Sequence, residues 1–214
     1  MLFKKTGILG INARNLLYLR PYNQEKEIEL ADDKLKTKAF LSARGISVPK
    51  LLGVINNVYE LHKFNFDKLG NEYVLKPNLG FGGEGIIPIL RKENDNFISS
   101  KNQIYSINYL KNHIIDILIG NFSLGHQVDK AFFEKLIISD EIIGRYAYQG
   151  LPDIRVIVHN LVPVMAMLRL PTKESNGKAN LHQGAIGAGI DLAKGEITHL
   201  YHNNEIKMSY FSFC

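Results

Sequence analysis

The sequence contains no tryptophan, and its single cysteine, Cys214, is the last of its 214 residues. One cysteine excludes a disulfide within the chain, which fits a reducing compartment, so we expect a cytoplasmic protein. Long hydrophobic runs are also missing. The most apolar stretch, 114–119, contains Asp116 and is far shorter than the roughly 20 residues of a membrane span. The N-terminus lacks the unbroken apolar core of a signal peptide.

A strong excess of one charge is absent as well. Lys and Arg number 26 and Asp and Glu number 21, which gives a net charge of +5. No dense basic run occurs, so nucleic acid is not an expected partner. The small positive excess suits a site for ATP and an acidic substrate. With 45% hydrophobic and 22% charged residues, the composition is that of a soluble globular protein with one or two small domains.

Glycine, by contrast, is concentrated in one segment, 73–90. A β-rich run ends at Lys76, a glycine loop follows, and a second β-rich run occupies 86–90. Glycines allow tight folding and close approach to a ligand, and successive N–H groups can surround an anion to which a lysine adds a point charge. We interpret the segment as a hairpin whose tip covers nucleotide phosphates; the alternative is an ordinary glycine hairpin with an incidental lysine. The loop glycines are Gly80, Gly82, Gly83 and Gly85.

Three better-known glycine motifs do not fit this segment. A Rossmann fingerprint needs a helix directly after the loop, whereas 86–90 is β-branched and contains Pro88. A P-loop ends in Gly-Lys-Ser/Thr, which is not found here. A protein-kinase loop has its lysine on the strand after the glycines, whereas Lys76 precedes them.

Hydrophobic periodicity predicts the other elements. Helical spacing occurs over 12–22, over 32–44 before a stop at Gly45, and over 106–119. Strand patterns occur at 51–55, 132–138 and 197–201, and 185–190 is small and glycine-rich. Two further β-rich runs, 154–159 and 162–168, are joined by His159-Asn160-Leu161 and predict a hairpin.

Five segments in this order resemble the ATP-grasp superfamily, and more closely its alpha-L-glutamate ligase-related, sugar-transfer-associated group. The resemblance runs from Gly7 to about His199. It implies an α+β ATP-grasp fold, with an antiparallel-sheet lid and an incomplete α/β core. The implied parts are an N-terminal segment and core helix at 1–45, a lid at 46–141 and a partial core at 142–214. The five segments are Asp33–Lys38, Val74–Gly85, Gly150–Arg155, Met165–Arg169 and Gly177–Gly184.

The resemblance also implies a chemistry. Most ATP-grasp proteins are carboxylate–amine ligases that activate a carboxylate as an acyl phosphate, with ATP and Mg²⁺ as cofactors. The implied partners are therefore ATP and a small carboxylate or amine substrate, and glutamate is suggested only by the family's name. Such phosphoryl transfer depends mainly on positioning and on charge neutralisation.

Site residues follow from the same resemblance. Lys38 and Lys76 are expected on the phosphates under the loop Gly80, Gly82, Gly83 and Gly85, and Ser139, Asp140, Glu141 and Ile142 in the adenine-binding hinge. Asp153 is expected beside the nucleotide, Arg155 and Arg169 on the transferred phosphoryl group, and Asn180 and His182 near the substrate. Lys38, Lys76, Arg155 and Arg169 are thus expected to converge on one cleft, and the helix 32–44 to pack with the segment beyond 142.

Simpler roles remain open for several of these residues. Lys34 and Lys36 compete with Lys38, and all three could lie on a solvated helix face. Arg155 and Arg169 could each form a surface ion pair. His182 could make a structural hydrogen bond instead of acting on substrate.

The sequence departs from the family pattern near its end. Family members place their Mg²⁺ ligands on late strands, including a Glu-x-Asn motif, and none of the late acids here lies in such a motif. We therefore assign no metal ligand and expect a C-terminally truncated chain with no appreciable ligation activity. Two alternatives remain: a catalytically inactive nucleotide-binding remnant, and a non-enzymatic interaction domain. The late acids are Glu174, Asp191, Glu196 and Glu205.

Overall fold

The computed structural model describes residues 9–94, 96–100 and 102–207. The start of the family resemblance at Gly7, Cys214 and the segment 208–214 lie outside the described residues. The chain divides into two compact units, Met1–Val48 and Pro49–Cys214, and each is described by itself. The expected division between 141 and 142 stays a prediction.

The described part of the first unit is helical. Asp33 separates its last two helices and caps the second, because its carboxylate accepts the N–H of Lys36 at 2.8 Å. The Thr37 hydroxyl donates to the carbonyl of Leu30 at 2.6 Å and joins the two helices. The helical elements are α1 (Ile11–Ala13), η1 (Arg14–Leu19), α2 (Arg20–Tyr22), α3 (Glu25–Asp32) and α4 (Lys34–Ser42).

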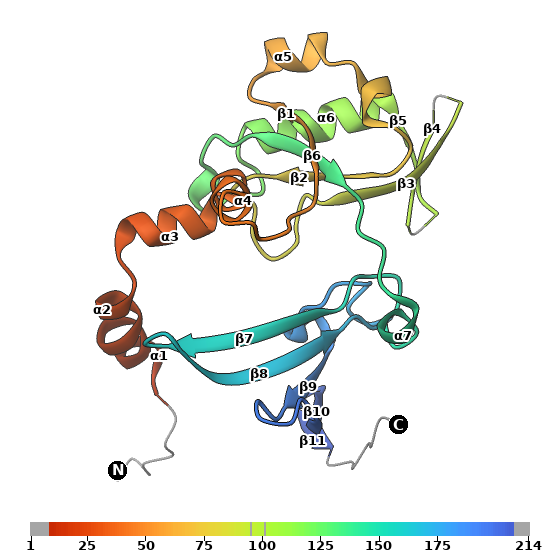
Figure 1. The fold of residues 1–214 in the computed structure, drawn as a ribbon. Helices are drawn as coiled ribbons and strands as arrows, with labels where there is room; N and C mark the ends of the chain where they lie inside the picture. Colours follow the sequence, from red (N-terminus) through yellow and green to blue (C-terminus); the bar gives the residue numbers. More distant parts are fainter. Residues whose placement is uncertain (1–8, 95, 101, 208–214) are drawn as a thin grey trace, which may run out of the picture. The chain divides into compact units, whose positions relative to one another are not determined.

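The second unit contains a six-stranded antiparallel sheet (Figure 1) with strand order β1-β6-β2-β3-β4-β5. The glycine hairpin β2–β3 therefore lies in the middle of the sheet, with β6 beside β2. The strands are β1 (Leu51–Ile55), β2 (Tyr73–Pro77), β3 (Ile87–Glu93), β4 (Asn96–Ser99), β5 (Ile104–Ser106) and β6 (Ala131–Lys135). The helices of this region are α5 (Val58–Lys63), η2 (Phe66–Leu69), α6 (Ile107–Leu118) and η3 (Leu124–His126).

The buried core lies between this sheet and its helices. Ser106 caps α6 by accepting the N–H of Tyr109, and α6 turns a buried apolar face toward the sheet, as its 3.6-residue spacing requires. On the sheet side, the ring of Phe133 stacks on Phe64 at 5.0 Å and meets the edge of Tyr73 at 5.7 Å. The buried face of α6 consists of Leu110, Ile114, Ile117 and Leu118.

A five-stranded antiparallel sheet follows, with order β11-β10-β9-β8-β7, so each strand pairs with its neighbour in sequence. Asn160 and Leu161 form the tight turn between β7 and β8 with φ of 49° and 65°. The elements after β6 are α7 (Glu141–Gly144), β7 (Asp153–His159), β8 (Val162–Leu170), η4 (Leu181–Gln183), β9 (Ile186–Ile190), β10 (Ile197–His202) and β11 (Glu205–Lys207).

Most predicted elements are confirmed with shifted ends. The helix predicted at 32–44 begins at Lys34, because Asp33 is its cap, and the strand predicted at 132–138 ends at Lys135. The second strand of the glycine hairpin begins at Ile87 and extends to Glu93. The glycine-rich segment 185–190 contains a strand, β9, which its composition did not indicate.

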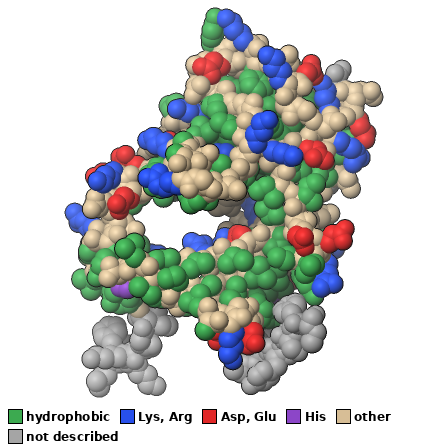
Figure 2. Space-filling view, in the orientation of Figure 1, with side chains coloured by type: hydrophobic (Ala, Val, Ile, Leu, Met, Phe, Trp, Pro, Cys, Tyr) green, Lys and Arg blue, Asp and Glu red, His purple; other side chains and the backbone are tan. Residues whose placement is uncertain are grey.

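Hydrophobic side chains gather over β7 and β8 (Figure 2). Ile154 is 64% exposed and Val162 is 59% exposed, and no residue of β7 is buried. β7 is an edge strand of its sheet, and an edge strand with exposed apolar side chains can pair with a strand of another chain. Among the helices that the structure describes, none is long and apolar enough to cross a membrane.

Candidate functional site

The glycine loop connects β2 to β3 and exposes its tip, 81–84. Gly82 and Gly83 have φ of 62° and 76°, which favour glycine, and the N–H of Glu84 donates to the carbonyl of Phe81 at 3.1 Å. The loop therefore makes a tight turn at the end of a well-packed hairpin, and its backbone is open to a ligand.

Lys76 lies on β2, four residues before Gly80, and forms an ion pair with Glu134 on β6. The Glu134 side chain is only 6% exposed and that of Lys76 is 27% exposed. Burial of a carboxylate is costly unless it is paired or hydrogen-bonded, and here the ion pair with Glu134 holds Lys76 at the base of the glycine loop. Sequence reasoning missed Glu134. Its signal is an acid inside the apolar strand Ala131–Lys135.

A second cation lies close to the loop tip. A Cβ atom built on Gly83 would lie 3.9 Å from the Cδ atom of Lys178, in van der Waals contact. Lys178 belongs to the segment 177–184, which the sequence assigned to the substrate. The sequence did not single out Lys178, because nothing in its local pattern marks it.

The β7–β8 hairpin places three of the predicted residues on one face. Asp153 lies directly opposite Arg169, and Arg155 lies opposite Met167, so alternation puts all four side chains on the same side of the sheet. Arg169 donates from Nε and from one terminal nitrogen to the two carboxylate oxygens of Asp153, both at 2.6 Å. The guanidinium of Arg169 is thus oriented by Asp153, whereas Arg155 is exposed.

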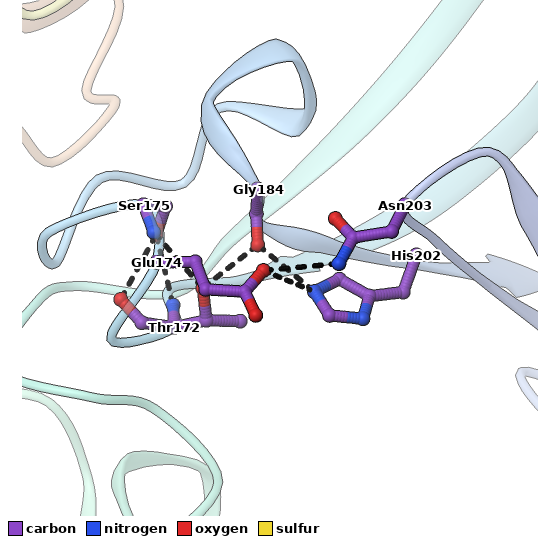
Figure 3. A network of polar contacts seen from close by, with 6 residues as sticks. All are labelled: Thr172, Glu174, Ser175, Gly184, His202 and Asn203. Carbon is purple, nitrogen blue, oxygen red and sulfur yellow. Dashed lines mark hydrogen bonds and ion pairs between the residues drawn. The ribbon is translucent and has the colours of Figure 1, made fainter.

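The loop that carries Asn180 and His182 is closed at its base by a polar network (Figure 3). The Thr172 hydroxyl donates to the carbonyl of Gly184 at 2.7 Å, and the Nε2 atom of His202 lies 3.2 Å from the same oxygen. Nε2 of His202 also lies 3.3 Å from a carboxylate oxygen of Glu174, which accepts from Asn203 at 3.1 Å.

Within this loop, Asn180 has a structural role. Its side-chain oxygen accepts the N–H of His182 at 3.2 Å and caps the short helix η4. The side chain of His182 is exposed. A role for either residue toward substrate stays a prediction.

The predicted adenine hinge, Ser139 to Ile142, leads into α7, which begins at Glu141. The carboxylate of Asp140 accepts the N–H of Ile142 at 2.9 Å and is the N-cap of this helix. Ser139 lies beside Gly144, whose Cβ position would be 3.3 Å from the Ser139 hydroxyl oxygen. Contact of this segment with adenine stays a prediction.

Lys38 lies on α4, in the first unit, and its position at the phosphates also stays a prediction. The helical period places Lys34 and Lys38 on one face of α4 and turns Lys36 away from it. The Nζ atom of Lys36 lies 3.9 Å from a carboxylate oxygen of Asp33, the N-cap residue of the same helix. Helix geometry therefore groups Lys38 with Lys34 rather than with Lys36.

Three of the four late acids, Glu174, Asp191 and Glu196, have a local partner. Asp191 accepts N–H groups from Ala193 at 2.8 Å and Lys194 at 3.0 Å, and these hydrogen bonds lower the pKa of its carboxyl group. Glu196 lies 4.0 Å from Lys194. In the part of the chain that the structure describes, no three His, Cys, Asp or Glu side chains gather as a metal site.

The second unit thus contains an antiparallel sheet whose central hairpin carries a lysine and then an exposed glycine loop. Comparison with protein families identifies the chain more closely, because the model of the sugar-transfer associated ATP-grasp family matches residues 13–210. The chain belongs to this family, and its two antiparallel sheets with helices are an α+β fold. Searches of curated proteins and of solved structures found no match.

Proposed function

We propose that this chain binds ATP under the Gly80–Gly85 loop and uses it to activate a carboxylate for attack by an amine. The observation that carries the proposal is the ion pair between Lys76 and Glu134 at the base of an exposed glycine loop. The loop supplies backbone N–H groups for phosphate oxygens, and Lys76 supplies a charge at a fixed position.

The reaction needs little covalent chemistry from the protein. A carboxylate oxygen attacks the γ-phosphorus of ATP and ADP leaves; an amine then attacks the acyl carbon and phosphate leaves. Arg155, exposed on the face of β7 that also carries Asp153, is the group that we assign to the transferred phosphoryl oxygens. Arg169, which is ion-paired with Asp153, would help to stabilise the negative charge on the same phosphoryl oxygens. Glutamate is the first carboxylate to test.

Proteins of this family generally use Mg²⁺ with ATP. The late acids do not form such a site among the described residues: Asp191 caps a turn, Glu174 contacts His202 and Asn203, and no three His, Cys, Asp or Glu side chains gather there. We therefore assign no step to a metal. The same positions favour a second candidate function, nucleotide binding without ligation.

Calorimetric titration with ATP tests the site. Lys76→Met alone would remove the Lys76 charge from the nearly buried Glu134 carboxylate, so the informative variant is Lys76→Met/Glu134→Gln, which removes both charges at similar volume. We expect it to fold and to bind ATP about tenfold or more weakly than the wild type, because a charged hydrogen bond contributes about 1.5–3 kcal/mol.

The matched control is Lys92→Met/Asp67→Asn, which removes an ion pair of 2.7 Å that involves β3 of the same sheet, with Asp67 exposed. It should leave ATP affinity unchanged. Wild-type affinity in the Lys76→Met/Glu134→Gln variant would reject the site.

Hydroxylamine trapping separates the two candidate functions. A ligase incubated with ATP, glutamate and hydroxylamine should release ADP together with the hydroxamate of its carboxylate substrate. ATP binding without ADP or hydroxamate, across a panel of amino acids, would support nucleotide binding alone.

A further inference from the structure

The glycine loop is free at its tip but fixed at both ends. Side chains from α6 and from the segment that follows, 119–130, hold both ends. At the first end, the N–H of Leu79 donates to both carboxylate oxygens of Asp129 at 2.9 Å. Gly80 also forms an isolated β-bridge with Ser123. Asp129 is 2% exposed, so this end of the loop is held by a buried acceptor.

At the second end, two rings hold Gly85. The Nε2 atom of His113, on α6, lies 2.8 Å from the carbonyl oxygen of Gly85. A carbonyl only accepts, so Nε2 carries the hydrogen of this bond. The ring of Phe122 fills the space beside Gly85, since a Cβ there would lie 2.7 Å from its Cγ atom. The His113 and Phe122 rings pack together with centroids 5.1 Å apart.

Helix α6, which carries His113, is anchored in the hydrophobic core and so supports this end of the loop. Ile114 and Leu110 on α6 are completely buried in the core, and His113 is half-buried beside them. Tyr109, one turn earlier, stacks over His113 with centroids 6.4 Å apart. The imidazole therefore connects the core to the loop, and its orientation is fixed from two sides.

We propose that His113 is a positioning residue for nucleotide binding: its hydrogen bond to Gly85 sets where the exposed tip, 81–84, stands over the polyphosphate. The inference rests on the proposed function, since it requires a nucleotide under the loop. No contact between His113 and the ligand is involved. A fixed loop loses less conformational freedom when it closes on phosphates, so anchoring raises affinity without a new contact.

The anchor is tested first without nucleotide. Hydrogen–deuterium exchange of the 81–86 amides is measured in the wild type and in His113→Leu, which keeps an apolar side chain but removes the donor. We expect exchange to rise about fivefold, the factor that corresponds to one lost hydrogen bond. His113→Gln should restore slow exchange, because its amide nitrogen can donate at a similar reach. His62→Leu, at an exposed histidine of α5, is the matched control and should change nothing.

The second measurement compares ATP with AMP by calorimetry. Because the tip covers the polyphosphate, His113→Leu should weaken ATP by about three- to tenfold and AMP by less than about twofold, and His113→Gln should restore ATP affinity. A merely structural role would weaken both nucleotides alike.

Unchanged exchange in His113→Leu, or equal losses of ATP and AMP affinity, would overturn the proposal. If the wild type binds neither nucleotide, the proposed function fails, and with it the role of His113 in binding. The exchange comparison would then still show whether His113 fixes the loop.

Discussion

Arg169 and Asp153 lie directly opposite each other on β8 and β7, and the guanidinium holds both carboxylate oxygens at 2.6 Å. The side chain of Arg169 is 20% exposed and that of Asp153 is 41% exposed. A two-point contact of this kind orients the arginine and joins the two strands. The pair therefore contributes to the stability of the hairpin as well as to the charge of the face.

A double-mutant cycle with Arg169→Met and Asp153→Asn measures this contact. We expect a coupling energy of about 1 kcal/mol, above that of typical exposed pairs because the geometry is bidentate. The Lys194–Glu196 pair is the control; its atoms lie 4.0 Å apart and both side chains are about two-thirds exposed. Its cycle should give no measurable coupling. Equal coupling energies in urea unfolding would contradict the expectation.

Replacing loop glycines by alanine should separate backbone strain from steric contact. Gly82 has φ of 62° with no atom within 4 Å of a Cβ, so Gly82→Ala should cost only about 1–2 kcal/mol of unfolding free energy. Gly85 has φ of 70°, and its Cβ would also collide with Phe122. Gly85→Ala should therefore cost at least about 1 kcal/mol more. Equal losses in urea unfolding would show that Phe122 moves freely.

The turn between β7 and β8 is a site for stabilisation. Leu161 has φ of 65° and is 93% exposed, although this hairpin turn favours Asn-Gly. Leu161→Gly should raise the unfolding free energy by about 0.5–1 kcal/mol, because glycine adopts positive φ without strain. Leu161→Ala is the control, since it removes the exposed side chain and keeps the strain. A gain of the same size in Leu161→Ala would assign the effect to the side chain.

Tyr73 is completely buried, and among the described residues its hydroxyl group is a buried polar atom without a hydrogen-bond partner. Such a group costs about 1–3 kcal/mol. Tyr73→Phe should therefore leave the unfolding free energy at pH 7 unchanged or raise it, which is unusual for a core substitution. A loss above about 1 kcal/mol in thermal or urea unfolding would indicate a partner for the hydroxyl.

Tyr73 should also set the response to alkali. Burial raises the pKa of its phenol above the ordinary value of 10.0. The folded protein then holds this proton more tightly than the unfolded chain does. Its contribution is complete below pH 10 and is lost as pH rises above 10, at up to about 1.4 kcal/mol per pH unit. Tyr73→Phe should flatten this decline when the unfolding free energy is measured in urea at increasing alkaline pH; an equally steep decline in Tyr73→Phe would contradict the assignment.

Local signals predicted the two hairpins and helix α6, because turn residues between β-rich runs and the helical spacing of apolar residues act within a few residues. The order of the six-stranded sheet could not be predicted, because β6 enters between β1 and β2 through pairs such as Lys76 with Phe132. The strands β4 and β5 and the helix α5 are short and were missed. The helix α3, which lies directly before Asp33, was missed as well.

For the site, the sequence predicted Lys76 and the glycine loop but not what holds them. Glu134 is 58 positions from Lys76, and His113 is 28 positions from Gly85, so only the fold brings these pairs together. Asp140 was assigned to the hinge by resemblance. The structure uses its carboxylate as a helix cap, a role that its position directly before α7 would have indicated.

The strand order also has a consequence for how the chain reaches this structure. β2 to β5 pair in sequence order, but β1 joins them only through β6, which begins at residue 131, so β1 must wait for about 75 further residues before the sheet can close. In the sheet from β7 to β11, each strand pairs with the next one in sequence, so the strands can pair one after another as the ribosome releases them. Because contacts distant in sequence slow folding, closure of the six-stranded sheet should limit the rate of folding. Until this sheet closes, its unpaired strands are exposed and can bind chaperones.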